Sequence, residues 1–157
     1  MASTECIFCD IVRGDAPASP VYADERAVAF MDIQPVNPGH LLVIPQTHAA
    51  CLAELEAETG AHLFRVGLDL AAAVRRAGVR CEGVNLCLAD GAAAGQEVFH
   101  VHLHVIPRFR GDDFGFRFGP DYVRRPERAA LDQAAAEIRR ALEEQDPWSV
   151  TTRATGG

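Results

Sequence analysis

Lysine is absent from this sequence: all 15 basic residues are arginines, and 22 aspartates and glutamates outnumber them. The resulting net charge of -7 argues against general affinity for DNA, RNA or an anionic membrane surface, because attraction to a polyanion needs a basic patch. No apolar run approaches the roughly 20 residues that a membrane-spanning helix needs. We therefore expect neither nucleic acid nor a membrane as a partner, whereas small anions fit the composition.

Cysteine is sparse as well. The chain has five cysteines, an odd number, and it begins without the charged and then apolar leader that is typical of secreted proteins. We therefore expect a reducing, cytoplasmic setting. The 157 residues suffice for one domain with a substantial apolar core, so a structural metal is not needed for size alone.

Short apolar runs bounded by turn residues predict several strands, of which the first two form a hairpin around Asp24 and Glu25. A loop of small residues, 91–95, leads from the last of these strands into a histidine-rich segment. The predicted strands that precede this segment lie at 21–23, 26–33, 40–44 and 83–89.

Helical periodicity extends from about Leu52 to Ala77, with a break expected near Thr59 and Gly60 and a stop at Gly78. A helix between a hairpin and later antiparallel strands favours an α+β fold over a doubly wound one. We predict a mainly antiparallel sheet of about five strands with this long helix packed on it.

The composition changes after Arg110. Residues 111–122 are rich in glycine, aspartate and phenylalanine, and 126–145 have the alanine, arginine and glutamate content of an amphipathic helix. We predict three parts: a core at 1–110, an extension at 111–148 whose helix packs on the core or on a dimer partner, and a disordered tail at 149–157.

Three histidines at a spacing of two are the most informative feature of the chain. In an extended segment His100, His102 and His104 share one face, and the valines and leucine between them face the core. Each buried imidazole has two nitrogens that need partners, so packing alone does not explain three of them. We expect chemistry on this face.

The three histidines do not share one metal ion, because the Cα atoms of His100 and His104 are expected about 13 Å apart, at roughly 3.3 Å per residue. Cys6 and Cys9 have the spacing that lets two thiolates bind one ion, and His48 is an available third ligand. The alternative for the two cysteines is a redox pair, which is expected to open a helix after a strand. We favour zinc.

The sequence resembles the histidine triad (HIT) family. His100-Val101-His102-Leu103-His104-Val105-Ile106 matches the alternating histidine signature, and Gly95 and Gln96 lead into it as in the family. The likeness covers roughly Cys6 to Arg110, and the remaining segments that carry it are Cys6 to Cys9, Phe30 to Ile33, His40 to Pro45 with His48, and Ile106 to Arg108.

The resemblance implies a HIT-like fold and a purine nucleotide phosphoramidase, or a related nucleotidyl hydrolase or transferase. His102 is then the nucleophile that forms a nucleotidyl-histidine, and His104 contacts the phosphate or the leaving group. The implied nucleotide-binding residues are Phe8, Ile11, Phe30 and Ile33 around the base, Asp32 on the ribose, and Gly95, Gln96, Glu97 and Val98 near the phosphate.

The resemblance also implies a structural zinc held by Cys6, Cys9, His48 and His100, a four-ligand set with no open position for water. It implies a homodimer, and a nucleotide or nucleotide conjugate similar to AMP as the ligand.

Two residues depart from the family pattern. Ala89 stands where an asparagine or glutamine usually helps to position the phosphate, and Asn85 lies so far upstream that it is not taken as a replacement without direct proof. Glu97 stands in place of a serine or threonine, and we expect its carboxylate to point away from a bound phosphate. These departures keep open the alternative of a nucleotide-binding or zinc-stabilised module with vestigial catalysis. Within the same chemistry, a dinucleoside polyphosphate hydrolase is a further alternative.

Other polar and sulfur-containing residues receive the ordinary interpretation of core or surface. Asp32 also fits a turn-capping role. The residues predicted to have no functional role are His40, His62, Cys51, Cys81, Cys87, Arg108, Arg110, Arg124 and Arg125.

Overall fold

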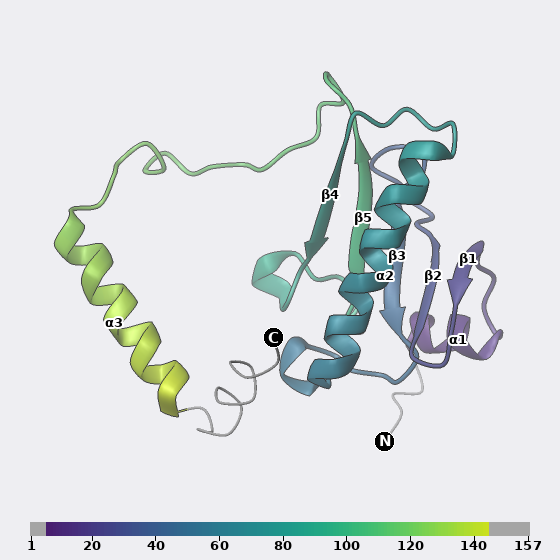
Figure 1. Cartoon of the computed structure of the whole chain (residues 1–157), viewed down its shortest axis with the longest axis horizontal. Helices are drawn as coiled ribbons and strands as arrows, with labels where there is room; N and C mark the ends of the chain where they lie inside the picture. Colours follow the sequence, from purple (N-terminus) through teal and green to yellow (C-terminus); the bar gives the residue numbers. More distant parts are fainter. Residues whose placement is uncertain (1–5, 145–157) are drawn as a thin grey trace. The chain divides into compact units, whose positions relative to one another are not determined.

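The computed structural model describes residues 6–144, which form two compact units, 6–114 and 115–144. The first unit is a five-stranded antiparallel sheet in the order β1-β2-β3-β5-β4, as the α+β prediction required (Figure 1). Within the described residues, no helix is long and apolar enough to cross a membrane. The elements are α1 Ile7–Arg13, β1 Pro20–Ala23, β2 Ala27–Met31, β3 Leu41–Pro45, α2 Ala57–Arg76, β4 Gly83–Leu88, β5 Leu103–Arg108 and α3 Arg128–Glu144, with one-turn 3-10 helices at Leu52–Glu54 and Ala92–Ala94.

The β1–β2 hairpin turns at Asp24, as predicted. The Asp24 carboxylate accepts hydrogen bonds from the backbone N–H groups of Arg26 and Ala27, both at 2.8 Å. It also accepts one from the Tyr22 hydroxyl, and this contact is the main reason why the pKa of Asp24 lies well below its usual range. His62 on α2 lies 2.6 Å from the same carboxylate, so this histidine ties the helix to the hairpin.

Helix α2 begins at Ala57, and the predicted break near Thr59 and Gly60 was wrong. The chain breaks instead at Leu55, which has extended dihedral angles after the 3-10 turn. Thr59 and Gly60 lie in the first turn of α2, where the N–H of Gly60 donates to the carbonyl of Glu56 at 2.9 Å. The helix ends at Arg76, and Gly78 follows with a φ of +80°, consistent with the predicted stop.

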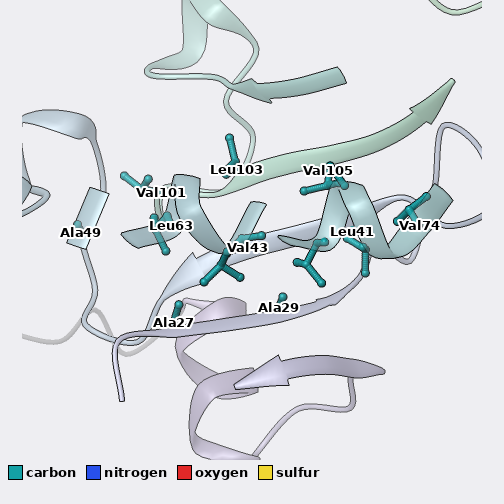
Figure 2. Packing of buried hydrophobic residues seen from close by; sticks show 13 residues of the cluster. Ala27, Ala29, Leu41, Val43, Ala49, Leu63, Val74, Val101, Leu103 and Val105 are labelled. Carbon is teal, nitrogen blue, oxygen red and sulfur yellow. The ribbon is translucent and has the colours of Figure 1, made fainter. Parts of the chain in front are cut away.

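The two faces of the sheet are chemically different because side chains alternate along each strand. One face packs under α2: Val43, Leu103 and Val105 contact Leu63 and neighbouring residues of the helix in the main core (Figure 2). Helix α2 can approach β5 closely because residue 67 of the helix is a glycine: a Cβ at this position would lie 2.8 Å from Cδ2 of Leu103. The other face packs against α1, through Cys6, Phe8, Cys9, Phe30, Leu42 and Ile44.

Strand β5 begins at Leu103 and not at His100 as predicted. Upstream of Leu103 the ladder stops, and the N–H of Val101 donates instead to the carbonyl of Ala49 at 2.8 Å. The alternation nevertheless holds, because Val101, Leu103 and Val105 all lie in the main core. The three histidines are therefore presented on the opposite face.

Beyond residue 114 the second unit contains α3, which was predicted over 126–145 and extends from Arg128 to Glu144. None of its residues is buried. Residue 145 and the predicted tail at 149–157 lie outside the described residues.

Candidate active site

A cavity of about 690 Å³ lies on the face of the sheet that α2 does not cover. Its floor follows the strand register, in which Leu42 of β3 and Cys87 of β4 both pair with His104 of β5. Ten of the residues predicted to contact the substrate line this cavity: Phe8, Ile11, Phe30, Asp32, Ile33, Gly95, Glu97, Val98, His102 and His104.

The predicted base slot is the apolar side of the cavity next to α1. Phe8 and Phe30 meet edge to face, with ring centroids 5.5 Å apart. Ile33 is 96% exposed and therefore forms a rim, not an enclosing wall. Asp32 lies between this side and the histidines. Its Oδ1 accepts from the N–H of Gln34 at 2.8 Å, which confirms a turn-capping contact without excluding a second role.

His102 is buried but lines the cavity. Its Nδ1 lies 2.7 Å from the carbonyl oxygen of His100, an acceptor only, so Nδ1 carries the proton. Nε2 therefore has a free lone pair, and none of the described residues bonds to it. The ring is held edge to face against Phe8 at 5.3 Å. His102 thus presents a fixed, electron-rich nitrogen.

His104 has the opposite arrangement of protons. The N–H of Val36 donates to Nδ1 of His40 at 3.1 Å, which leaves the His40 proton on Nε2. That Nε2 donates to Nδ1 of His104 at 2.9 Å, so the neutral His104 ring carries its proton on Nε2. Asp32 Oδ2 lies 3.5 Å from the same nitrogen of His40. We name Val36, His40 and His104 the donor relay, which ends on an N–H.

Electrostatics keep the donor relay uncharged. Burial, followed by the neighbouring His102 and His40, lowers the pKa of His104 to about 4, although Asp32 opposes this shift. Burial also lowers the pKa of His40, again against the pull of Asp32. Both rings are therefore neutral near pH 7, as the alternating hydrogen bonds require.

A second cluster surrounds His100, which is fully buried. Its Nδ1 lies 3.5 Å from Cys6 Sγ, 3.6 Å from Cys9 Sγ and 3.3 Å from Nδ1 of His48, and Cys9 lies 3.3 Å from His48. Ligands at 2.0–2.3 Å from a tetrahedral ion are separated by about 3.3–3.8 Å, so the four atoms have suitable spacing for one ion. We name these four residues the Cys/His cluster.

Backbone contacts aim His100 at this cluster. Its Nε2 donates to the carbonyl of Pro45 at 2.9 Å, which leaves Nδ1 as the free ligand atom, the outer support that metal-binding histidines generally have. Without a cation the site is unfavourable for charge: burial and the adjacent Cys6 raise the pKa of the Cys9 thiol to about 11. A bound divalent ion reverses this preference, because it stabilises thiolates.

The family model described as "HIT domain" matches residues 13–111. The chain belongs to the HIT family.

Solved structures and curated proteins agree with this assignment. SMU.412c from Streptococcus mutans superposes on this HIT protein with a TM-score of 0.82, at 38% identity, over 90% of this chain and 88% of the other. A Zn-bound histidine triad family protein from Mycobacterium smegmatis superposes with a TM-score of 0.68, at 46% identity, over 84% of this chain and 96% of the other. Adenylylsulfatase HINT3 of Arabidopsis thaliana is 38% identical over 109 residues, 69% of this chain and 54% of that protein.

The loop at residues 91–98, which the resemblance places near the phosphate, uses its side chains partly in another way than we expected. Gln96 was expected to contact the nucleotide, but its buried side chain accepts from the N–H of Gly91 at 2.7 Å and donates to the carbonyls of Ala50 at 2.8 Å and Val98 at 3.1 Å. Gln96 is therefore used in closing the loop and does not line the cavity. Glu97 lines the cavity, as expected for a residue near the phosphate, and it is exposed; that its carboxylate points away from a bound phosphate stays a prediction.

Sequence reasoning missed His40, which was taken as an ordinary core histidine, and Arg108, which was taken as a surface arginine. His40 has the same parity as Leu42 and so falls on the cavity face, a signal that the strand pattern already contained. Arg108 forms a two-point ion pair with Asp112, with contacts at 2.6 and 2.7 Å. It also donates to Oδ1 of Asn85.

Proposed function

We propose that this HIT protein cleaves nucleotide phosphoramidates at the α-phosphorus through a nucleotidyl-histidine. One observation supports this most directly: two neighbouring imidazoles, with ring centroids 4.9 Å apart, present opposite groups to one cavity. His102 offers a lone pair and His104 offers an N–H. A displacement at phosphorus uses both, the lone pair to attack and the N–H to hydrogen-bond the group that departs.

The reaction has two steps. Nε2 of His102 forms a bond to the α-phosphorus while the P–N bond breaks. The departing nitrogen takes a proton from a water molecule in the cavity, and Nε2–H of the neutral His104 donates a hydrogen bond to it. The hydroxide that remains from this water then attacks the phosphorus of the nucleotidyl-histidine, and the bond to His102 breaks, returning its electron pair to Nε2 and releasing the nucleoside monophosphate. The backbone N–H groups of Glu97 and Val98 have no acceptor among the described residues and are available to the phosphate oxygens, whereas the N–H of Gly95 already donates to the carbonyl of Ala92 at 3.0 Å.

The nucleoside occupies the side of the cavity next to α1 and β2. Its base lies against Phe8 and Phe30, and Asp32 accepts hydrogen bonds from the ribose hydroxyls. A carboxylate has enough lone pairs to accept both ribose bonds while it keeps its contact with the N–H of Gln34.

The Cys/His cluster holds a structural zinc. Two thiolates and two imidazoles are a common closed zinc set, and such an ion joins the first residues of the described chain to the histidine segment. Bound zinc supplies folding energy there, and His102 and His104 keep the chemistry.

The cavity favours this reaction over hydrolysis of dinucleoside polyphosphates. Among the described residues that line it there is no arginine, whereas Asp32 and Glu97 are acidic. A chain of further phosphates would therefore find repulsion and no cationic partner. The homodimer and the cytoplasmic location stay predictions.

The test is to trap the intermediate. The protein is mixed with adenosine 5'-phosphoramidate, quenched in milliseconds to seconds and analysed by mass spectrometry for an adenylyl group on His102. His102→Ala should abolish turnover but still bind AMP, and His62→Ala, outside the cavity, should behave as the unaltered protein. Unchanged turnover in His102→Ala would refute the nucleophile, and AMP binding without adduct or product in the unaltered protein would favour the vestigial module.

A further inference from the structure

The cavity continues past His104 along β5, away from His102. Its wall there consists of Ile106 on β5, Cys87 on β4 and Phe114, which follows the strand by a short turn. Ile106 is buried and Cys87 is half-buried beside His104. This end of the cavity is apolar, and the proposed nucleoside site on α1 and β2 does not use it.

In-line displacement gives this end a role. The attacking and leaving atoms lie on opposite sides of the phosphorus. If His102 attacks the phosphorus from one direction along β5, the leaving group departs in the opposite direction, where His104 presents its N–H. The next cavity residues in that direction are Ile106 and Phe114.

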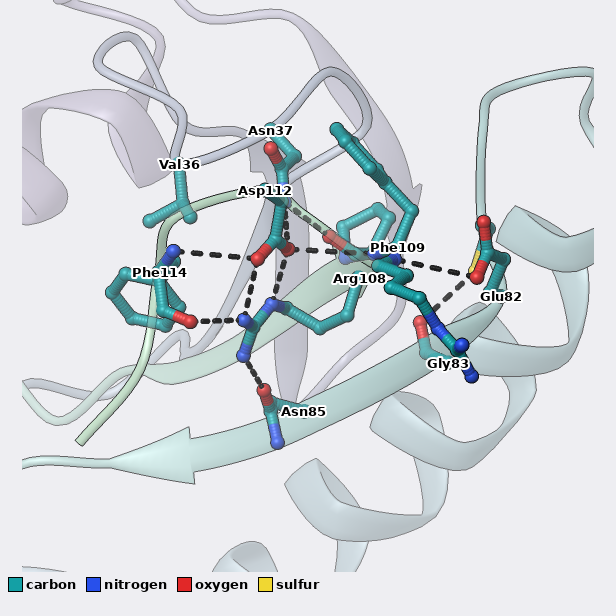
Figure 3. Close-up of polar contacts among 12 residues, drawn as sticks. Val36, Asn37, Glu82, Gly83, Asn85, Arg108, Phe109, Asp112 and Phe114 are labelled. Carbon is teal, nitrogen blue, oxygen red and sulfur yellow. Dashed lines mark hydrogen bonds and ion pairs between the residues drawn. The ribbon is translucent and has the colours of Figure 1, made fainter.

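Phe114 is fixed in place by a network that we name the clasp: Arg108, Asp112 and Asn37. The N–H of Phe114 donates to Asp112 Oδ1 at 3.3 Å, and its carbonyl accepts from Arg108. Asn37 donates to Asp112 Oδ2 and to the carbonyl of Pro107, both at 2.8 Å. Figure 3 shows the Arg108 head group between Asp112 and Asn85, with Phe114 beside it.

The clasp also neutralises the charge of Arg108 at this end of the cavity. Arg108 Nε and Nη2 contact the two oxygens of Asp112 at 2.6 and 2.7 Å, so this cation is already paired. The guanidinium carbon lies 4.8 Å from the centre of the Phe114 ring. The ring is still 43% exposed, which leaves surface for a ligand to cover.

We propose that Phe114, held by the clasp, determines specificity for the leaving group and selects amines that have an apolar, preferably aromatic, substituent. This inference rests on the proposed function, because it assumes cleavage of a P–N bond at the α-phosphorus. Arg108, Asp112 and Asn37 are positioning residues that act through Phe114.

The test compares two substrates with the same nucleoside and phosphorus: adenosine 5'-phosphoramidate, with an unsubstituted amine, and its N-(2-phenylethyl) derivative. Phe114→Ala should lower kcat/KM for the phenylethyl substrate about tenfold, the scale of one lost aromatic contact, and change the unsubstituted substrate less than about twofold. The matched control is Phe109→Ala, since Phe109 stacks on Arg80 at 4.1 Å and does not line the cavity.

Asp112→Asn tests the clasp and should lower the ratio of kcat/KM for the phenylethyl substrate to kcat/KM for the unsubstituted one. In Phe114→Leu this ratio should lie between the values of the unaltered protein and of Phe114→Ala. An equal loss on both substrates, or no loss on either, would overturn the specificity role while the proposed function survives. If the unaltered protein cleaves neither substrate, the proposed function fails and the inference fails with it.

Discussion

The histidine segment has a cluster of potential ligands at each end: Cys6, Cys9 and His48 around His100, and Asp32 and His40 around His104. At the first end the four ligand atoms contact one another at similar distances, between 3.3 and 3.6 Å where they are closest. At the second end the contacts form a line from Val36 through His40 to His104. Histidine, the residue type that both clusters share, thus takes part in two different geometries.

The difference shows how backbone partners assign tasks to imidazoles. His100 donates a hydrogen bond from Nε2 to the carbonyl of Pro45, which leaves Nδ1 free for a metal. His104 accepts a hydrogen bond at Nδ1, which leaves its Nε2–H for the cavity. A closed set of thiol and imidazole ligands suits an ion, and a line of alternating donors and acceptors suits a hydrogen-bond donor that is held in one orientation.

Removing the metal site should have the largest effect. Cys9→Ser should lose bound zinc and lower Tm by about 10 °C or more, because metal binding at such sites contributes directly to folding. The matched control is Cys51→Ser, a thiol outside the Cys/His cluster. Zinc content and calorimetry provide the measurements. A protein that contains no zinc when purified under reducing conditions would remove the metal from this end.

Breaking the donor relay should affect catalysis more than stability. His40→Leu should lower kcat about 100-fold, because His104 loses the partner that keeps its proton on Nε2. His40→Gln should recover much of the rate, since the terminal amide of glutamine can replace the Nε2 donor. Steady-state kinetics and Tm are measured together. If the leucine and glutamine variants are equally slow, His40 has a packing role only.

Acid should destabilise the relay end. The pKa of His104 is about 4 in the folded chain and about 6.5 in an unfolded one, so the unfolded state binds the proton first. The stability from His104 is therefore complete above about pH 6.5 and is lost as pH falls towards 4, by up to about 3 kcal/mol. The groups that face it are His102, His40 and Asp32.

Denaturant unfolding at several pH values, compared between the unaltered protein and His104→Asn, measures this effect. The variant should show a shallower loss of stability between pH 6.5 and 4. Identical slopes in the two proteins would show that His104 does not contribute.

The smallest expected effect is at Asp32. Asp32→Asn keeps an oxygen for the N–H of Gln34, so the turn should survive. We expect KM for a nucleotide substrate to rise about tenfold, on the scale of a charge-assisted hydrogen bond, with kcat changed less than about threefold. The same variant should show no penalty on a 2',3'-dideoxy substrate. An unchanged KM with the ribose substrate would leave Asp32 as a turn cap alone.

Much of this arrangement was predictable from periodicity. The alternation of His100, His102 and His104 with core residues placed two histidines in the cavity, and the spacing of Cys6 and Cys9 marked a possible ligand pair, whereas the full set of four ligands was implied by the family resemblance. The start of β5 was not predictable, because it depends on where β3 and β4 stop pairing with it.

What escaped prediction depends on contacts between residues far apart in the chain. Gln96 has the type expected at a phosphate site, but its amide is taken by the carbonyl of Ala50. Arg108 and Asp112 form an ion pair that includes Asn37, 75 residues upstream of Asp112. No local pattern signals either contact.

Main-chain carbonyls orient two of the three histidine rings, Pro45 for His100 and His100 for His102, and the side chain of His40, itself held by the amide of Val36, orients His104. Point substitutions elsewhere leave the main-chain partners in place, whereas inserting or deleting one residue would move them out of reach. Grafting this chemistry onto another scaffold would therefore require transferring the backbone at Val36, Pro45 and His100, together with His40, along with the three imidazoles.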